Sequence, residues 1–370
     1  MRDDSLKLDE IDNPPPWPGA NDRLILGSGA WIDPIKRLAI FSFEEFEIFV
    51  LQWVSEYLKK RVISVNYQGG PGDKGRDIIA WLDDINVEPR RWNLYQCKHY
   101  GVPIAPSDIW VELGKLCYYT FNHHYTIPEN YYLVAPKGVG PTLQDLINNP
   151  KKINIQLMEN WNQYCRTKIT KSEEVSLEGD FYNYVKKFDF SIIRSIPPHE
   201  LIEQHSKTRY HSFVFGISLK PRPKPPVPPA DIDPKESIYI QQIFEPYSDY
   251  LEVLISKPED FELDEELMKF YQYSRICFYC AEALKEFTRD TLPDESFYYD
   301  ILDQIHQGIM ISLIEKHPDA YEKMKKTCEQ SIVVPISGNI LQNHLKPNDK
   351  IGICHHLVNE ERIKWVINDN

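Results

Sequence analysis

Apolar residues in the first half of the chain change spacing from segment to segment. In FSFEEFEIFVLQWVSEYL they recur at three- and four-residue steps, which predicts a helix. Its apolar stripe consists of Phe43, Phe46, Val50, Trp53, Val54, Tyr57 and Leu58. Short apolar runs bounded by turn residues then predict strands. The expected elements are a helix at 41–58, strands at 62–67, 77–82 and 92–98, a helix at 106–121 and a strand at 131–136. This order indicates an α/β domain with a central mixed sheet flanked by helices.

The second half of the chain has a different pattern. PRPKPPVPP, at residues 221–229, excludes a helix or a central strand and predicts a stiff, extended linker. Beyond it the pattern is mainly helical, with prolines between the segments. We therefore expect an N-terminal arm at 1–40, an α/β domain at 41–138, a connecting region of unassigned fold at 139–220, a linker at 221–235 and a mainly α domain at 236–370.

Polar residues stand at the ends of two predicted strands, next to their apolar runs. Asp77 begins the strand at 77–82, and Gln96 and Lys98 end the next one on a shared face, because side chains two apart in a strand point the same way. A hairpin between these strands can bring all three together. Glu47 lies inside the apolar stripe of the first helix, where a carboxylate is costly unless a metal or hydrogen bonds compensate it. Glu44 and Glu45 lie nearer the polar side and remain alternatives to it.

This set of side chains suits metal-dependent phosphodiester hydrolysis. Carboxylates hold Mg²⁺, the metal activates a water and neutralises phosphate charge, and a lysine stabilises developing charge. Glycines at 69, 70, 72 and 75 allow the intervening loop to approach a sugar–phosphate backbone. The loop contains no GK[ST] sequence and is therefore not a Walker A element. Lys74 and Arg76 flank it and are candidates for phosphate contact or for simple solubility.

The motifs GDKGRD (72–77) and QCK (96–98), with the element order above, resemble the PD-(D/E)xK restriction-endonuclease fold, and most of all its Mrr-like branch. The resemblance covers residues 41–136. It implies that Asp77 binds Mg²⁺, with Mn²⁺ as a substitute, that Gln96 and Lys98 form the (D/E/Q)xK element, and that Glu47 is the helix carboxylate. Gln96 replaces the usual acid, which leaves one strand carboxylate instead of two. The position of Lys115 in this family makes it a candidate for contact with the DNA backbone. Its spacing from Glu112 also fits an ordinary intrahelical ion pair.

A second resemblance covers residues 219–366 and is carried by IYIQQIFEPYSDYL, FYCAEALKEFTRDTLP and DKIGICHHLVNEERIKWV. These segments are similar to the C-terminal domain of ABC three-component defence systems, of which Lamassu is the best-known type. That resemblance implies an effector nuclease associated with an SMC-like ATPase and a small third subunit. It also implies that the domain keeps the nuclease silent on its partners and oligomerises it on release.

Charge changes this picture in one respect. The net charge is −13, and residues 245–300 carry fifteen acidic against five basic residues, whereas residues 36–125 carry eleven of each. Because the acidic and basic residues of the predicted nuclease domain are equal in number, it lacks the excess of positive charge that attracts DNA. We therefore expect weak DNA binding unless the protein assembles or has DNA delivered to it. The acidic stretch is either a solvated face, a DNA-repelling surface or a match for a basic partner.

The cysteines and the termini add little. Seven scattered cysteines favour a reducing compartment, and the polar N-terminus is no secretory signal, so a cytoplasmic location without membrane association is expected. Cys277 with Cys280, and Cys354 with the two histidines that follow, fit core packing better than a zinc site.

The sequence thus predicts a Mg²⁺-dependent endodeoxyribonuclease of low sequence specificity, acting on double-stranded DNA as an antiviral effector. Two alternatives remain open: a free-standing Mrr-like restriction enzyme for modified DNA, and a non-catalytic scaffold whose nuclease fold has decayed.

Overall fold

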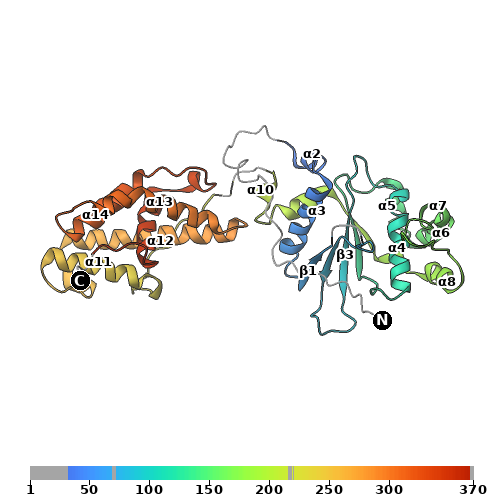
Figure 1. Ribbon diagram of the computed structural model, residues 1–370, viewed down its shortest axis with the longest axis horizontal. Coiled ribbons are helices and arrows are strands. Elements are labelled where there is room, and N and C mark those ends of the chain that lie inside the picture. Colours follow the sequence, from blue (N-terminus) through green and yellow to red (C-terminus); the bar gives the residue numbers. More distant parts are fainter. Residues whose placement is uncertain (1–31, 69–71, 216–218, 220, 367–370) are drawn as a thin grey trace. The chain divides into compact units, whose positions relative to one another are not determined.

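The computed structural model describes residues 32–68, 72–215, 219 and 221–366, and these residues fall into two compact units. Within the described residues, the N-terminal unit ends at 215 and the C-terminal unit begins at 219. Figure 1 shows an α/β arrangement in the first unit and packed helices in the second. The predicted fold class is therefore confirmed: a mixed sheet with flanking helices, followed by an all-helical region.

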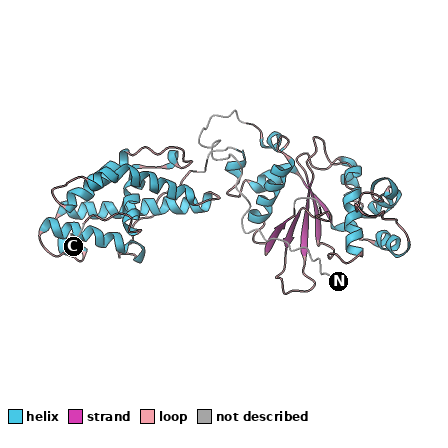
Figure 2. Ribbon diagram, in the orientation of Figure 1, coloured by secondary structure: helices cyan, strands magenta, loops and turns pink. Residues whose placement is uncertain are grey.

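The N-terminal unit is built around one five-stranded sheet of order β1-β2-β3-β4-β5 (Figure 2). The strands are β1 (Ser64–Tyr67), β2 (Ile78–Trp81), β3 (Trp92–Cys97), β4 (Asn130–Val134) and β5 (Ile193–Ile196). The first three strands pair antiparallel and the last two pairings are parallel. The predicted hairpin places Ile78 opposite Tyr95, so Asp77, one residue earlier, faces the end of β3.

Helices cover both faces of this sheet (Figure 1). On one face lie α3 (Phe43–Gln52), its continuation as a π-helical turn (Trp53–Tyr57) and α9 (Pro198–His205), where Trp53 meets Tyr95 edge to face. The other face packs Trp92, Leu94 and Tyr131 into a core with the following helices. These are α4 (Trp110–Phe121), α5 (Pro141–Ile147), α6 (Pro150–Glu159), α7 (Trp161–Tyr164) and α8 (Gly179–Lys187). The short helices α2 (Pro34–Leu38) and α10 (His211–Phe215) complete the unit.

Two details differ from the sequence-based expectation. Phe43, assigned to the buried stripe, is 44% exposed. The reason is the start of the helix, because Ser42 caps α3 reciprocally with Glu45 and leaves the first turn outside the core. In addition, the region at 139–220, whose fold the sequence left open, supplies β5 to the sheet and α6 and α8 to the core.

The C-terminal unit consists of packed helices. They are α11 (Ser237–Leu251), α12 (Glu265–Thr291), α13 (Ser296–Ile314), α14 (Ala320–Val333) and α15 (Pro347–Asn359). The closest packing is between α12 and α15, where Gly352 leaves no room for a side chain against the Cys277 carbonyl. Cys277, Cys280 and Cys354 are buried in this core with free thiols. The proline-rich stretch at 221–229 adopts neither helix nor strand, as expected.

Two buried carboxylates of the C-terminal unit are held in ion pairs with arginines. Glu236 is fully buried and accepts two hydrogen bonds from Arg275, at 2.5 and 3.0 Å. Arg222 pairs with buried Asp349 at 2.7 Å. Each carboxylate has its own guanidinium, the group that best matches carboxylate geometry.

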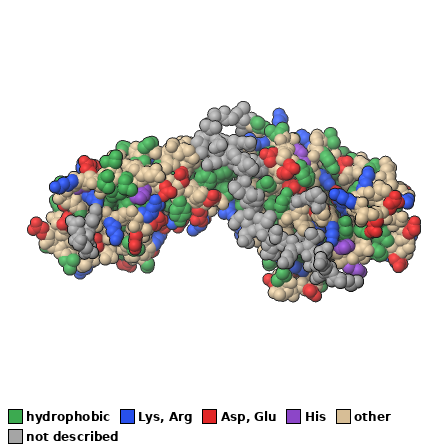
Figure 3. Space-filling model, viewed as in Figure 1, with side chains coloured by type: hydrophobic (Ala, Val, Ile, Leu, Met, Phe, Trp, Pro, Cys, Tyr) green, Lys and Arg blue, Asp and Glu red, His purple; other side chains and the backbone are tan. Residues whose placement is uncertain are grey.

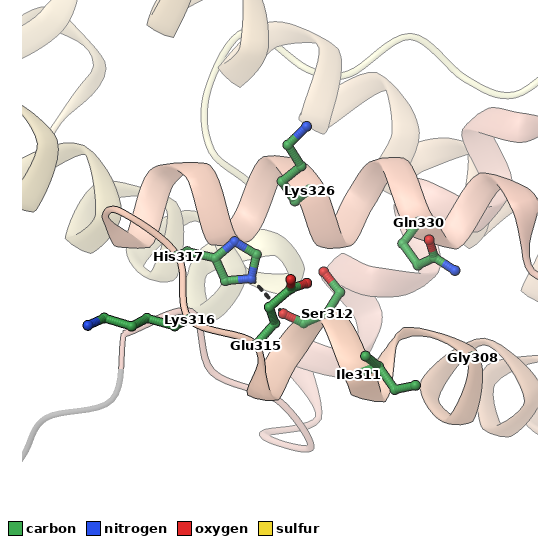
Figure 4. Close-up of a pocket in the computed structure, with 8 residues that line it drawn as sticks. All are labelled: Gly308, Ile311, Ser312, Glu315, Lys316, His317, Lys326 and Gln330. Atoms are coloured by element: carbon green, nitrogen blue, oxygen red, sulfur yellow. Dashed lines mark hydrogen bonds between the residues drawn. The ribbon is translucent and has the colours of Figure 1, made fainter.

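A surface hollow of about 390 Å³ lies between α13 and α14 (Figure 4). Gly308 and Ser312 line it on α13, and His317 closes one end with its Nε2 2.7 Å from the Ser312 carbonyl oxygen. Ile311, on the same rim, is 76% exposed.

No helix in the part of the chain that the structure describes is long and apolar enough to cross a membrane.

Candidate nuclease site

The structure brings Asp77 and Gln96 together at the end of the sheet. Asp77 immediately precedes β2 and is only 4% exposed. Its Oδ2 accepts hydrogen bonds from Gln96 Nε2 at 2.6 Å and from the Cys97 backbone N–H at 2.7 Å. The antiparallel register explains this contact, because it sets Asp77 opposite Gln96. Among the described residues, Asp77 Oδ1 has no hydrogen-bond partner.

The environment of Asp77 makes its ionised form costly. The pKa of this carboxyl is raised to about 7, mainly by burial and to a smaller extent by the nearby charges of Glu47 and Asp73. The Cys97 N–H and Lys98 act in the opposite direction without cancelling the effect. A carboxylate that shares a buried site with other acids favours a bound cation, since a positive charge would restore its ionised state.

Glu47 is the helix acid that faces this site. Of the three acids on α3, Glu44 is exposed, Glu45 serves the N-terminal cap, and Glu47 is 3% exposed. Its Oε2 accepts a hydrogen bond of 2.8 Å from the Tyr67 hydroxyl at the end of β1. Burial raises the pKa of Glu47, and Asp73 and Glu44 also raise it, whereas the Tyr67 hydroxyl lowers it.

Lys98 is directed toward α4. Its Nζ lies 2.7 Å from Glu112 Oε1, and it forms no ion pair with Asp77. Burial lowers the pKa of Lys98, but the charge of Glu112, its hydrogen bond to Lys98 and the charge of Asp77 together outweigh burial, so that the net shift is upward. Glu112 also pairs with Lys115 at 3.1 Å, and the two lysines hold the pKa of the buried Glu112 below its usual range. The intrahelical pair of Glu112 and Lys115 considered from sequence is present, and Lys98 also binds Glu112, so the three side chains form one cluster.

The glycine loop lies against the ion pair of Glu112 and Lys115. Gly72 and Gly75 adopt φ of +107° and +79°, which side-chain-bearing residues rarely do. Gly69 and Gly70 lie outside the described residues. A Cβ at Gly75 would lie 3.2 Å from Lys115 Cδ and 3.4 Å from Glu112 Oε2, so the loop packs directly on this ion pair.

The two basic residues of the loop have different surroundings. Arg76 is buried, with its guanidinium 4.5 Å from the centre of the Tyr125 ring and its Nε bonded to the Asp73 carbonyl. Lys74 is partly exposed, and its Nζ lies 3.2 Å from His124 Nδ1. Arg76 therefore braces the loop in this arrangement, and Lys74 is the more accessible to a phosphate. A DNA-contacting role for either residue stays a prediction.

Three participants were not assigned to the site from sequence: Tyr67, Asp73 and, as the partner of Lys98, Glu112. The position of Tyr67, at the end of a strand next to the glycine loop, was the only local signal for it. Glu112 was visible only as a neighbour of Lys115, because its contact with Lys98 joins a helix to a strand.

The residues present fit a magnesium ion coordinated largely by water. Mg²⁺ is commonly held by one or two carboxylates and keeps several waters. Asp77 and Glu47 each keep one oxygen without a hydrogen-bond partner among the described residues. The described residues include no group of three or more His, Cys, Asp or Glu side chains arranged around a metal position. Gln96 directs its nitrogen to Asp77 and its oxygen to Tyr131 at 3.4 Å, so its role as a ligand stays a prediction.

Comparison with known proteins identifies the C-terminal unit. Residues 236–365 match the family model of C-terminal domain 6 of the ABC-three component (ABC-3C) systems. The chain thus carries a domain of the kind found in ABC three-component systems after an α/β unit. No curated protein and no solved structure matches the chain.

Proposed function

We propose that the N-terminal unit is a metal-dependent endonuclease for DNA and the effector of an ABC three-component system. The observation that carries the proposal is the buried Asp77, whose pKa is raised to about 7 beside Gln96, Glu47 and Lys98. Strongly perturbed titratable groups gathered at one end of a sheet are typical of catalytic sites. The resemblance to the PD-(D/E)xK fold supplies the reaction class, the hydrolysis of phosphodiester bonds.

The side chains of the site divide into those that would hold the metal, those that orient them and a lysine that acts on the phosphate. Asp77 and Glu47 would hold Mg²⁺ or Mn²⁺, and Gln96 and the Cys97 N–H orient the Asp77 carboxylate. Tyr67 fixes Glu47 by its hydrogen bond. Lys98 stabilises negative charge on the phosphate and orients the attacking water. When bound, the metal lowers the pKa of a coordinated water and neutralises phosphate charge.

Charge distribution supports control by partners. Figure 3 shows basic and acidic side chains interspersed over the described surface of each unit on the face drawn. Such a surface provides little non-specific attraction for DNA, so activity would depend on assembly or on delivery of DNA. We propose that an SMC-like ATPase and a small third subunit bind the C-terminal domain, and that release leads to a homo-oligomer with little sequence specificity.

A non-catalytic scaffold is the second candidate. One observation favours it: Lys98 is paired with Glu112 and forms no ion pair with Asp77. The match to an ABC three-component domain, on the other hand, favours a system component over a free-standing Mrr-like restriction enzyme.

Plasmid cleavage separates these candidates. The full chain is incubated over a wide concentration range with Mg²⁺ or Mn²⁺, beside EDTA, Asp77→Ala and Lys98→Ala controls. We expect cutting that rises steeply with protein concentration and disappears in all three controls. If no cutting occurs alone or with the partner subunits, the scaffold is the correct assignment.

A further inference from the structure

Two lysines of the proposed site share one carboxylate. Glu112 Oε1 lies 2.7 Å from Lys98 Nζ, and Glu112 Oε2 lies 3.1 Å from Lys115 Nζ. The three side chains are 15%, 23% and 11% exposed for Lys98, Lys115 and Glu112, so solvent screens these contacts incompletely. Within the described part of the chain, neither lysine has another anionic partner within ion-pair distance. Each oxygen of Glu112 is therefore engaged by a different ammonium group.

This shared carboxylate lies against the glycine loop. Gly75, the last glycine of the loop, packs on both Lys115 and Glu112. Lys115 is the most exposed of the three charged side chains and comes from α4, whereas Lys98 follows β3 next to Asp77. Lys115 is thus the more accessible of the two lysines to a phosphate at the loop.

We propose, on the basis of the nuclease function above, that Glu112 is a charge latch that competes with DNA phosphates for Lys98 and Lys115. Phosphate oxygens are ionic acceptors of the same kind as the Glu112 oxygens, so they can take over the same N–H donors. While the latch is closed, the two lysines contribute little to DNA binding, and Lys98 is held away from Asp77. Glu112 is in this sense a positioning residue, because it acts through the two lysines.

The latch has a signature in salt dependence. Each lysine that pairs with a phosphate releases counterions and steepens the dependence of log K on log salt by about 0.9. A lysine that merely exchanges a carboxylate for a phosphate releases fewer of them. Removing the Glu112 charge should therefore both tighten DNA binding and steepen its salt dependence.

The test is binding of a short DNA duplex to the full chain in EDTA, from 50 to 200 mM salt, so that it does not depend on cleavage. For Glu112→Gln we expect binding tighter by roughly 3- to 10-fold at the lowest salt, and a slope steeper by about 0.9 to 1.8. The matched control is Glu159→Gln, on the exposed end of α6, which removes the same charge away from the lysines. Its slope should equal that of the wild type.

A second variant separates geometry from net charge. Glu112→Asp keeps the charge but shortens the side chain by one methylene, so that it cannot reach both ammonium groups. We expect affinity and slope between those of wild type and Glu112→Gln, and this variant also serves if Glu112→Gln does not fold.

Several results would overturn the latch. Slopes and affinities of the Glu112 variants equal to those of Glu159→Gln would do so, as would weaker binding, which would mean that Glu112 holds the lysines ready for DNA. Failure of every variant to bind DNA would also overturn it. DNA binding without cleavage, in contrast, would contradict only the proposed reaction.

Discussion

The two units of this protein bury charge in different ways. In the C-terminal unit Glu236 is paired with Arg275, and Asp349 is paired with Arg222. These pairs join the helices to the segments around them. In the N-terminal unit Asp77 and Glu47 are buried with no basic partner among the residues that the structure describes, while Lys98 and Lys115 share one acid. Matched buried charges serve a fold, whereas unmatched ones persist where a ligand completes them. The contrast supports the proposal that the chemistry belongs to the first unit and that the second is a scaffold.

The largest effect is expected from Asp77→Asn on cleavage. The amide keeps the shape and the hydrogen-bond acceptor but removes the charge that would hold the metal. Cleavage should fall by at least about 1,000-fold, a loss of roughly 4 kcal/mol of transition-state stabilisation. The rate of plasmid cutting measures it, with circular dichroism as the control for folding. A variant that cuts as fast as wild type would show that Asp77 is structural.

Breaking a matched pair should cost stability instead. Glu236→Ala leaves the Arg275 guanidinium buried without its carboxylate and should destabilise the C-terminal unit by about 3–5 kcal/mol. Urea unfolding of the full chain measures this. The control is Glu265→Ala, whose partner Lys269 is exposed and whose loss should cost no more than about 0.5 kcal/mol. Equal effects of the two substitutions would remove the distinction between buried and surface pairs.

The unmatched Asp77 should make the N-terminal unit less stable as pH rises. The pKa of Asp77 is raised from 3.8 to about 7, so between these values the folded protein keeps a proton that the unfolded chain has lost. Stability contributed by the protonated form is complete below about pH 4 and is lost as pH rises through 7, by about 4 kcal/mol. In metal-free buffer, Asp77→Asn should remove this part of the pH dependence and be more stable than wild type at pH 8. Parallel stability curves for the two proteins would show that the carboxylate is compensated.

The smallest effect is expected at Tyr67. Its hydroxyl lowers the pKa of Glu47, so Tyr67→Phe should raise that pKa further and cost about 1 kcal/mol in hydrogen bonding. Ionised Glu47 would then appear at higher pH, and the acidic limb of the cleavage profile should move upward by less than about one pH unit. The pH–rate profile is the readout, and the control is Tyr182→Phe, which changes an exposed side chain of α8. A shift to lower pH would contradict the role of Tyr67.

The sequence predicted the elements of the sheet well because their apolar runs are short and sharply bounded. The contact of Asp77 with Gln96 followed from the hairpin, since strand periodicity determines which side chains meet. The strand at 193–196 was not predicted, because IRSI contains only two buried apolar residues and joins the sheet far along the chain. Nor could periodicity reveal that Lys98 pairs with Glu112, since that choice depends on how α4 packs against β3.

The most direct test of the central claim is binding of Mn²⁺ to the full chain, followed by electron paramagnetic resonance at pH 6 and pH 8. The account predicts tighter binding at pH 8, where Asp77 is ionised without the metal, and loss of that site in both Asp77→Asn and Glu47→Gln. The exposed-acid variant Glu159→Gln should bind as the wild type does. Absence of Mn²⁺ binding by the wild type at pH 8, or unchanged binding in Asp77→Asn, would contradict the account.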